Sequence, residues 1–223
     1  MFKLVNGGQI PTKGTKYSAC VDLYANADVV IGAGETKIVP LGVKIDLEKL
    51  KAISDRDMEN TFGMPIDRII SSVDGDEDEV YFENFMCSHK LDLHIRSSLS
   101  AKKGLIIANG TGQIDLDYPD EIGIILHNPY FYKLKAIEKA HEDCHTDDGG
   151  NFDFREKVDS ILYGIEIKKG DRIAQITLVE HKLYLFGIES EEERVGGYGS
   201  TDKQAYSYDE KNVNAATSMK IIK

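Results

Sequence analysis

The chain has 223 residues, a length that predicts one large domain or two small ones. Hydrophobic residues make up 41% of it, enough for a folded core. Its formal net charge of −11 argues against a clamp for a nucleic-acid backbone, which needs a basic surface, but allows a small anionic ligand held by a few local donors. Three scattered cysteines, and the lack of a long apolar run or a basic-then-apolar leader, predict a cytoplasmic protein without a membrane span or secretory signal.

Residues 1–46 have the pattern of an all-β barrel or sandwich. Short β-branched runs are interrupted by Gly or Pro in "DLYANADVVIGAGETKIVPLGVKIDL". The same pattern returns after residue 90, with strands expected near 91–95 and 105–108 and a turn at Asn109-Gly110. "EIGIILHN" and "DRIAQITLVEH" predict two further strands. Since neither a G-x-G-x-x-G nor a P-loop pattern occurs, the nucleotide-binding α/β folds lose support.

Two segments depart from this β pattern, and we interpret them as insertions at about 48–88 and 129–163. In the first, Leu47, Leu50 and Ile53 have helical spacing, whereas the acidic run "DGDEDE" at 74–79 is typical of a solvated loop. The domain prediction is therefore one β domain over 1–201, interrupted by two partly helical insertions and followed by a polar tail at 202–223.

Four segments carry residues suited to chemistry. "RSSLSAKKG" at 96–104 offers a guanidinium and two hydroxyls for phosphate oxygens, although, for this segment alone, an ordinary helix N-cap at Ser97 or Ser98 is the commoner explanation. "ERVGGYGST" at 193–201 suits either a loop that closes over a ligand or a flexible linker. In "GDRIAQITL" at 170–178, Arg172 and Gln175 lie three apart, so they face opposite sides of a strand unless it is bulged.

The fourth segment is "GTGQIDLDYPDEIG" at 110–123, in which apolar and acidic residues alternate. Asp115 and Asp117 are expected on one strand face, with Ile114, Leu116 and Tyr118 on the other. A carboxylate there can orient and deprotonate a water. The alternative is an exposed strand edge that is protected by its charge.

Taken in order, these segments resemble the five motifs of the trimeric dUTP diphosphatases (dUTPases). The matching stretches are "ACVDL", "IRSSLSAKKGL", "NGTGQIDLDYPDEI", "KGDRIAQITL" and "RVGGYGST", and "IPTKGTKYSA" is similar to the usual opening of the family. The resemblance implies an all-β jelly roll that forms a homotrimer with active sites shared between subunits. It also implies hydrolysis of dUTP to dUMP and pyrophosphate with Mg²⁺, in nucleotide metabolism.

The resemblance also implies roles for individual residues. Asp115 matches the water-activating aspartate that starts attack on the α-phosphate, and Asp22 matches the acid that holds Mg²⁺ through water. Tyr118 matches the tyrosine that excludes a 2′-hydroxyl. The other matches bind substrate, through uracil, the phosphates or a closing arm; they are Arg96, Ser97, Ser98, Asn109, Gly112, Gln113, Ile114, Gln175, Arg194, Tyr198, Gly199 and Ser200.

Other functions compete with this interpretation. A dCTP deaminase shares the scaffold but needs a glutamate where this chain has Ile125, three residues before Asn128. A non-catalytic regulatory protein, or a protein partner bound through the insertions, remains an alternative, and inserts of this length would suit a viral or phage enzyme. Five residues in the insertions are candidate zinc ligands, although their spacing is irregular; they are Cys87, His89, His141, Cys144 and His145.

Overall fold

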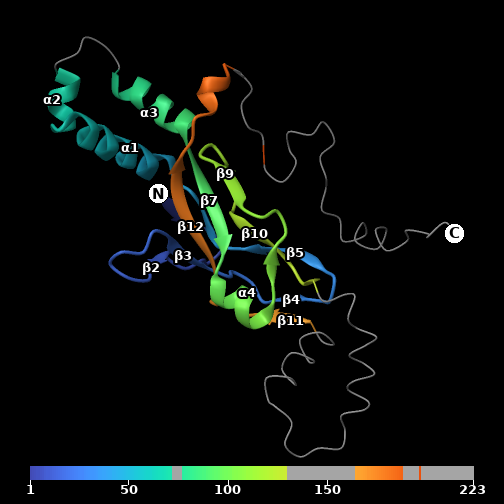
Figure 1. Cartoon of the computed structure of the whole chain (residues 1–223). Coiled ribbons are helices and arrows are strands. Elements are labelled where there is room, and N and C mark those ends of the chain that lie inside the picture. Colours follow the sequence, from blue (N-terminus) through green and yellow to red (C-terminus); the bar gives the residue numbers. More distant parts are fainter. Residues whose placement is uncertain (72–76, 130–163, 188–195, 197–223) are drawn as a thin grey trace, which may run out of the picture.

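The structure is a computed structural model of the chain, and it describes residues 1–71, 77–129, 164–187 and 196 (Figure 1). Its strands are β1 Phe2–Leu4, β2 Thr12–Lys13, β3 Val21–Tyr24, β4 Val29–Ile31, β5 Thr36–Pro40, β6 Val43–Ile45, β7 His89–Ile95, β8 Ile106–Ile107, β9 Gly112–Asp115, β10 Gly123–His127, β11 Ile165–Ile167 and β12 Arg172–Glu180. Its helices are α1 Leu47–Phe62, α2 Ile66–Ser71, α3 Glu77–Ser88, α4 Ser97–Lys103 and the 3₁₀ turn η2 Leu183–Phe186. The strands pair antiparallel, and the prediction of an all-β domain of the jelly-roll kind is confirmed.

The largest sheet has the strand order β2-β3-β12-β7-β9. It has one apolar and one polar face, because side chains alternate along each strand. Leu91 and Leu93 of β7 are fully buried, whereas Asp92 between them is only partly buried. The polar face therefore presents residues of β3, β12, β7 and β9 side by side, and most of the predicted site residues of these strands lie on it.

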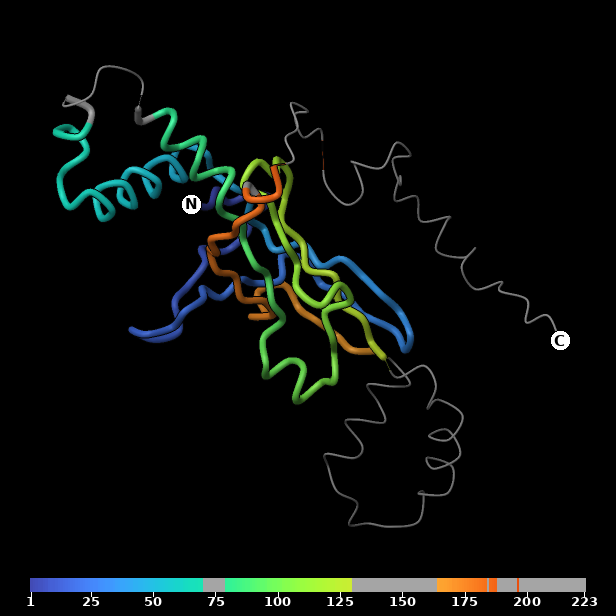
Figure 2. The backbone as a smooth tube through the Cα atoms, turned by 45° about the horizontal axis from the view of Figure 1, so that its top comes forward, coloured from blue at the N-terminus to red at the C-terminus, as the bar shows by residue number. Residues whose placement is uncertain are grey.

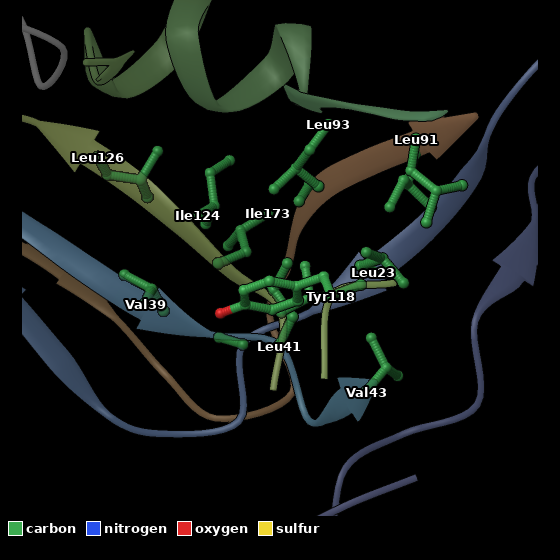
Figure 3. Packing of buried hydrophobic residues seen from close by; sticks show 14 of the residues in the cluster. Leu23, Val39, Leu41, Val43, Leu91, Leu93, Tyr118, Ile124, Leu126 and Ile173 are labelled. Carbon is green, nitrogen blue, oxygen red and sulfur yellow. The ribbon is translucent and has the colours of Figure 1, made fainter. Parts of the chain in front are cut away.

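The core forms where this sheet meets the shorter sheets β5-β10-β8 and β11-β4. Leu91 and Leu93 from the large sheet pack with Ile124 and Leu126 of β10, and the ring of Tyr118 lies among them (Figure 3). These side chains are at most 9% exposed, and burial of each large apolar side chain stabilises the fold by about 1.5–3 kcal/mol. The loop after β9 is thus anchored in the main core.

Helices α1, α2 and α3 form an arm that projects from one end of the β body (Figures 1 and 2). Asp46 caps α1 by accepting a hydrogen bond from the Lys49 backbone N–H at 3.3 Å, and its bond with Lys49 lowers the pKa of this carboxyl. Gly63 ends α1 with φ of 68°, a conformation that favours glycine. Along α1, Leu50 and Met58 are buried, which fits the helical spacing expected for this segment.

One expectation for this arm is wrong in part. The acidic run at 74–79 was expected to be a loop, yet α3 begins at Glu77, so the last three acidic residues form its first turn. Negative side chains are favoured at this end of a helix because the helix dipole is positive there. Residues 72–76, and most of the second predicted insertion, lie outside the described residues. That these segments are insertions stays a prediction.

Candidate functional site

The predicted turn at Asn109-Gly110 is present and leads into β9. Gly110 has φ of 73°, and its N–H donates to the Ile107 carbonyl at 3.3 Å. Gly112 then pairs with Leu93 of β7, and a Cβ atom added at Gly112 would lie only 3.2 Å from the Leu93 Cβ. The two glycines therefore have different tasks, since one supplies a left-handed turn and the other a close strand contact.

A pocket of about 200 Å³ lies beside this hairpin and contains six of the predicted site residues. This volume is below the ~300 Å³ at which pockets for whole drug-sized ligands begin, so it suits a single small ring. We call it the hairpin pocket; its walls are Leu93, Ile107, Asn109, Gly112, Gln113, Ile114, Asp115, Tyr118, Ile122, Gly123 and Ile125. Asp115 is the only ionisable carboxylate among these walls, so polar recognition rests largely on amide and backbone groups.

The side chain of Tyr118 is buried, and hydrogen bonds fix the loop that carries it. Its ring is 9% exposed, and its hydroxyl donates to the Glu121 carbonyl across 3.5 Å. The Glu121 carboxylate accepts hydrogen bonds from Asn6 at 2.7 Å, from the Gly42 backbone N–H at 2.7 Å and from Asn26 at 3.2 Å. Glu121 is thus a structural group, and it fixes the loop that positions Tyr118.

Asp115 stands at the end of β9 with an exposed side chain. The strand stops there because the chain turns, and the Tyr118 N–H donates to the Asp115 carbonyl at 3.1 Å. The expected alternation continues beyond the strand, since Leu116 is buried and Asp117 is exposed. Across the sheet Asp115 pairs with Lys90, whose ammonium lies 2.9 Å from a carboxylate oxygen of Asp92.

A second cluster forms around the buried carboxylate of Asp22 on β3. One oxygen, Oδ1, lies 3.2 Å from Arg96 Nε and accepts a hydrogen bond from Gln175 Nε2 at 3.3 Å. The other, Oδ2, accepts from Arg172 Nη1 at 3.3 Å. Asp22 is 4% exposed, whereas the Arg96 and Arg172 side chains are 24% and 48% exposed. We call these four residues the Asp22 corner.

A bulge in β12 explains why Arg172 and Gln175 both reach Asp22. Arg172 pairs with Tyr24 and Ala174 with Leu23, so Ile173 is an extra residue in the strand. The extra residue shifts the alternation, and two side chains three positions apart then face the same carboxylate. From the sequence, Arg172 and Gln175 could face the same side only if the strand was bulged. Arg172 was absent from the predicted site residues, and only its place in a strand motif shared with Gln175 could have indicated it.

The predicted serine motif lies beside the Asp22 corner in α4. Arg96 is the N-cap residue and makes no side-chain cap bond, so the interpretation of Ser97 or Ser98 as the cap is wrong. Both serines are exposed in the first turn. Ser98 and Arg96 line a hollow of about 320 Å³ together with Lys102, Lys103 and Arg172. Four cations around one hollow are notable in a chain of net charge −11.

The hairpin pocket and the Asp22 corner lie far apart within one chain. From β3 to β9 there are three strand spacings, which make about 14 Å. Asp22 shares a row with His94, whereas Asp115 shares a row with Lys90, four residues along β7, which adds about 13 Å. Asp115 and Asp22 are therefore separated by about 20 Å.

Magnesium was predicted at Asp22 through water. Each carboxylate oxygen can accept two hydrogen bonds, and Oδ2 has one contact from Arg172, which leaves capacity for a water. The residues thus fit a Mg²⁺ that keeps its waters and arrives with phosphates, the usual behaviour of this ion. Among the described residues no cluster of three or more His, Cys, Asp or Glu could hold a metal directly.

Several predicted residues lie outside the part of the chain that the structure describes. They are Arg194, Tyr198, Gly199 and Ser200 of the Gly-rich segment, and the candidate zinc ligands His141, Cys144 and His145. The other two candidates are described: Cys87 is an exposed free thiol, and the His89 ring stacks on Phe85 with centroids 4.1 Å apart. No helix in the described ranges is long and apolar enough to cross a membrane.

Comparisons with known proteins agree with the motif order. No family model matches the chain. It is 28% identical over 201 residues to the deoxyuridine 5′-triphosphate nucleotidohydrolase of Candida glabrata, covering 88% of this chain and 90% of the relative. The enzyme of that name from Corynebacterium glutamicum is also 28% identical, over 88% of this chain and 89% of its own.

Solved structures give a weaker likeness. The dUTPase of Streptococcus mutans is 19% identical with a TM-score of 0.45, over 82% of this chain and 96% of that one. A dUTPase mutant of Staphylococcus bacteriophage 80alpha is 18% identical with a TM-score of 0.47, over 89% of this chain and 96% of that one. The five ordered motifs, and two relatives matched over nearly their whole length, thus make the chain similar to the dUTPases.

Proposed function

We propose that the protein is a dUTP diphosphatase, which hydrolyses dUTP to dUMP and pyrophosphate. The observation that carries this function is the hairpin pocket, in which a small ring-sized space, Tyr118 and the exposed carboxylate of Asp115 come together. The relatives named deoxyuridine 5′-triphosphate nucleotidohydrolase support the same substrate.

Base and sugar are selected in the hairpin pocket. Asn109 and the main chain of Gly112 to Asp115 offer donors and acceptors to the uracil edge, while the apolar walls Ile107 and Ile125 leave little room for a methyl group on the ring. Tyr118 cannot move aside readily, because it is packed in the core and its loop is fixed by Glu121. A rigid ring next to the sugar excludes a 2′-hydroxyl by overlap.

Hydrolysis needs a base near the α-phosphate and positive charge around the other phosphates. Asp115 accepts a proton from the attacking water, which lies within hydrogen-bond reach of the carboxylate. Arg96, the serines of α4 and Gln175 bind phosphate oxygens, as guanidinium and amide groups do well. Mg²⁺, held through water at Asp22, supplies further charge neutralisation when bound, and most of the rate enhancement comes from such positioning and electrostatics.

The site is shared between copies of the chain. A triphosphate cannot span the 20 Å or so between Asp115 and the Asp22 corner while its α-phosphate stays close to both. A second copy that places its Asp22 corner beside the hairpin pocket removes this conflict. The family resemblance implies a homotrimer, and in our proposal the closing arm with Arg194, Tyr198, Gly199 and Ser200 comes from a neighbouring subunit.

The deciding experiment measures pyrophosphate release with Mg²⁺ from dUTP, dTTP, dCTP and UTP in parallel, for the wild type and for Asp115→Asn. We expect rapid release from dUTP alone, and its loss in the variant. Equal rates with dUTP and UTP would contradict the sugar selection by Tyr118, and no release from any of the four would refute the enzyme assignment.

The shared site is tested by mixing two inactive variants, Asp115→Asn and Arg96→Ala, under conditions that exchange subunits. Some sites in the mixture receive Asp115 from one parent and Arg96 from the other, so part of the activity returns. Each variant alone stays inactive. If a mixture with demonstrated exchange regains nothing, the site lies within one chain.

A dCTP deaminase is the alternative on the same scaffold, and the structure gives one reason against it. Ile125 lines the hairpin pocket, and an apolar side chain cannot perform the acid–base work that deamination requires. Ammonia release from dCTP would contradict this argument.

A protein partner is a further candidate, favoured by the helical arm. Phe62 and Val80 on this arm are 54% and 55% exposed, and exposed apolar side chains of this size are frequent in binding surfaces. We propose that the arm contributes partner binding in addition to catalysis. Phe62→Ser together with Val80→Ser should leave dUTP hydrolysis unchanged and weaken capture of any partner isolated with the wild type; a loss of hydrolysis instead would make the arm part of the enzyme itself.

A further inference from the structure

His94 lies in the same row of the main sheet as two residues of the Asp22 corner. Gln175 of β12 pairs with Asp22 of β3 on one side and with His94 of β7 on the other. Side chains that face each other across neighbouring strands project from the same side of the sheet, with Cβ atoms about 4.5–5.5 Å apart. The His94 ring therefore stands next to the Gln175 amide.

His94 is also next to Arg96 along its own chain. Arg96 keeps an extended conformation, with φ of −67° and ψ of 135°, although α4 begins directly after it. Residues two apart in an extended chain project from the same side, about 7 Å apart. Two independent relations, one across the sheet and one along β7, thus bring His94 to the residues that surround Asp22.

The His94 ring is available for a ligand. Of the four histidines in the described residues, His89, His127 and His181 each have a ring nitrogen within hydrogen-bond distance of another group. Within these same residues His94 has no such contact, and it is only half-buried. A half-buried imidazole without a partner, beside an arginine and an amide, has a donor to offer.

The charges that face His94 favour an anion. On β3, Asp22 is already engaged by two guanidinium groups and an amide. On β7, the carboxylate of Asp92 is paired with Lys90 at 2.9 Å. Arg96 and Arg172 therefore leave an excess of positive charge next to the ring. Phosphate oxygens fit such a set of donors.

We propose that His94 is a further phosphate-binding residue, which donates a hydrogen bond from its ring to the pyrophosphate portion of the substrate. This inference rests on the proposed function and adds a residue that the five motifs do not assign. Since the ring stands beside Gln175 and Arg96, to which we assign phosphate binding, it affects the binding of the distal phosphates rather than the activation of water, which is assigned to Asp115.

The test uses the full chain and inorganic pyrophosphate with Mg²⁺, measured by calorimetry. His94→Leu removes the donor, His94→Gln keeps one, and His127→Leu is the matched control on β10, where the ring contacts Thr36. We expect pyrophosphate to bind about tenfold more weakly to His94→Leu, an intermediate loss for His94→Gln, and no change for His127→Leu. The KM for dUTP should rise by the same factor with kcat within about twofold.

Wild-type affinity in a folded His94→Leu variant would overturn the proposal, as would a loss of kcat at unchanged KM. If His94→Leu does not fold, His94→Ala decides, because it also lacks a donor: wild-type pyrophosphate binding by His94→Ala contradicts a donor role. Hydrolysis of dUTP and phosphate binding by His94 are tested separately, because pyrophosphate binding can be measured without turnover. A wild type that binds pyrophosphate through His94 but leaves dUTP intact would refute only the proposed function.

Discussion

The hairpin pocket and the Asp22 corner represent two ways to build a binding site from one sheet. The pocket is made largely from main chain, glycines and apolar walls, and its single carboxylate points to solvent. The corner is made from charged side chains that are held by a buried carboxylate. The pocket is suited to bind a neutral ring by its shape and its hydrogen-bonding edge. The corner is suited to bind an anion by its charge, and the shape of the anion matters less.

This difference explains how each region tolerates change. Backbone groups cannot be removed by substitution, so the pocket is sensitive mainly to added volume and to the loss of Asp115. The corner depends on side chains that share one acceptor, so the loss of a single member affects the others. Four substitutions, taken from the largest expected effect to the smallest, test this contrast.

Asp115→Asn should lower kcat for dUTP by about 10³-fold, because the amide cannot accept the proton of the attacking water. Binding of dUMP in the pocket should be unchanged, since the side chain is exposed and its size is kept. Pyrophosphate release and calorimetric titration measure the two effects. Asp117→Asn, an exposed neighbour, serves as the control, and an equal loss there would show that general charge rather than Asp115 is responsible.

Asp22→Asn should lower kcat/KM by about 100-fold, because Arg96 and Arg172 lose their shared acceptor and shift position. Loss of hydrogen bonds to a buried charge should also reduce the free energy of unfolding by about 2 kcal/mol. Steady-state kinetics and urea unfolding measure both. Asp28→Asn, which alters an aspartate bonded to the Lys169 N–H, is the control; unchanged kinetics for Asp22→Asn would mean that the arginines hold their positions without it.

Gly112→Ala should raise the KM for dUTP several-fold and cost about 1 kcal/mol of stability. The new methyl group would meet Leu93 at 3.2 Å in the wall of the hairpin pocket. Gly110→Asn is the comparison, since the turn has open space there and asparagine tolerates its positive φ. If both variants raise KM equally, the turn rather than the strand contact controls the pocket.

Tyr118→Phe should have the smallest effect, within twofold in kcat/KM and below about 0.5 kcal/mol in stability. The bond from the hydroxyl to the Glu121 carbonyl is long, at 3.5 Å, while the ring supplies the packing. Discrimination against UTP should be kept, and competition between dUTP and UTP measures it. Loss of discrimination in this variant would show that the hydroxyl, not the ring, excludes the ribose.

Much of the fold and the hairpin pocket followed from local pattern. The turn at Asn109-Gly110, β7, β10 and β12 were predicted from β-branched runs and turn residues, which report on nearby backbone conformation. Six of the expected site residues line one pocket because they lie within one short segment, residues 109–118. Residues of one short segment lie close together in space, and this does not depend on how distant strands pair.

The Asp22 corner could not be predicted to the same degree. Its members come from β3, from β12 and from Arg96 between β7 and α4, and its geometry depends on one extra residue at Ile173. A bulge depends on how two strands pair, which local composition does not encode, so Arg172 was missed. The capping interpretation of Ser97 and Ser98 failed for a related reason: Arg96 takes the cap position while its side chain reaches Asp22. The roles assigned to the Gly-rich segment remain predictions.

The bonds made by Glu121 bear on the order in which the molecule folds. They join positions that are 115, 95 and 79 residues apart in the chain, and such long loops close slowly because their closure costs entropy before any contact forms. The loop that carries Tyr118 is fixed only when these distant partners have docked. A partly refolded molecule in which Asn6, Asn26 and Gly42 have not yet docked on Glu121 should therefore fail to distinguish a deoxyribose from a ribose.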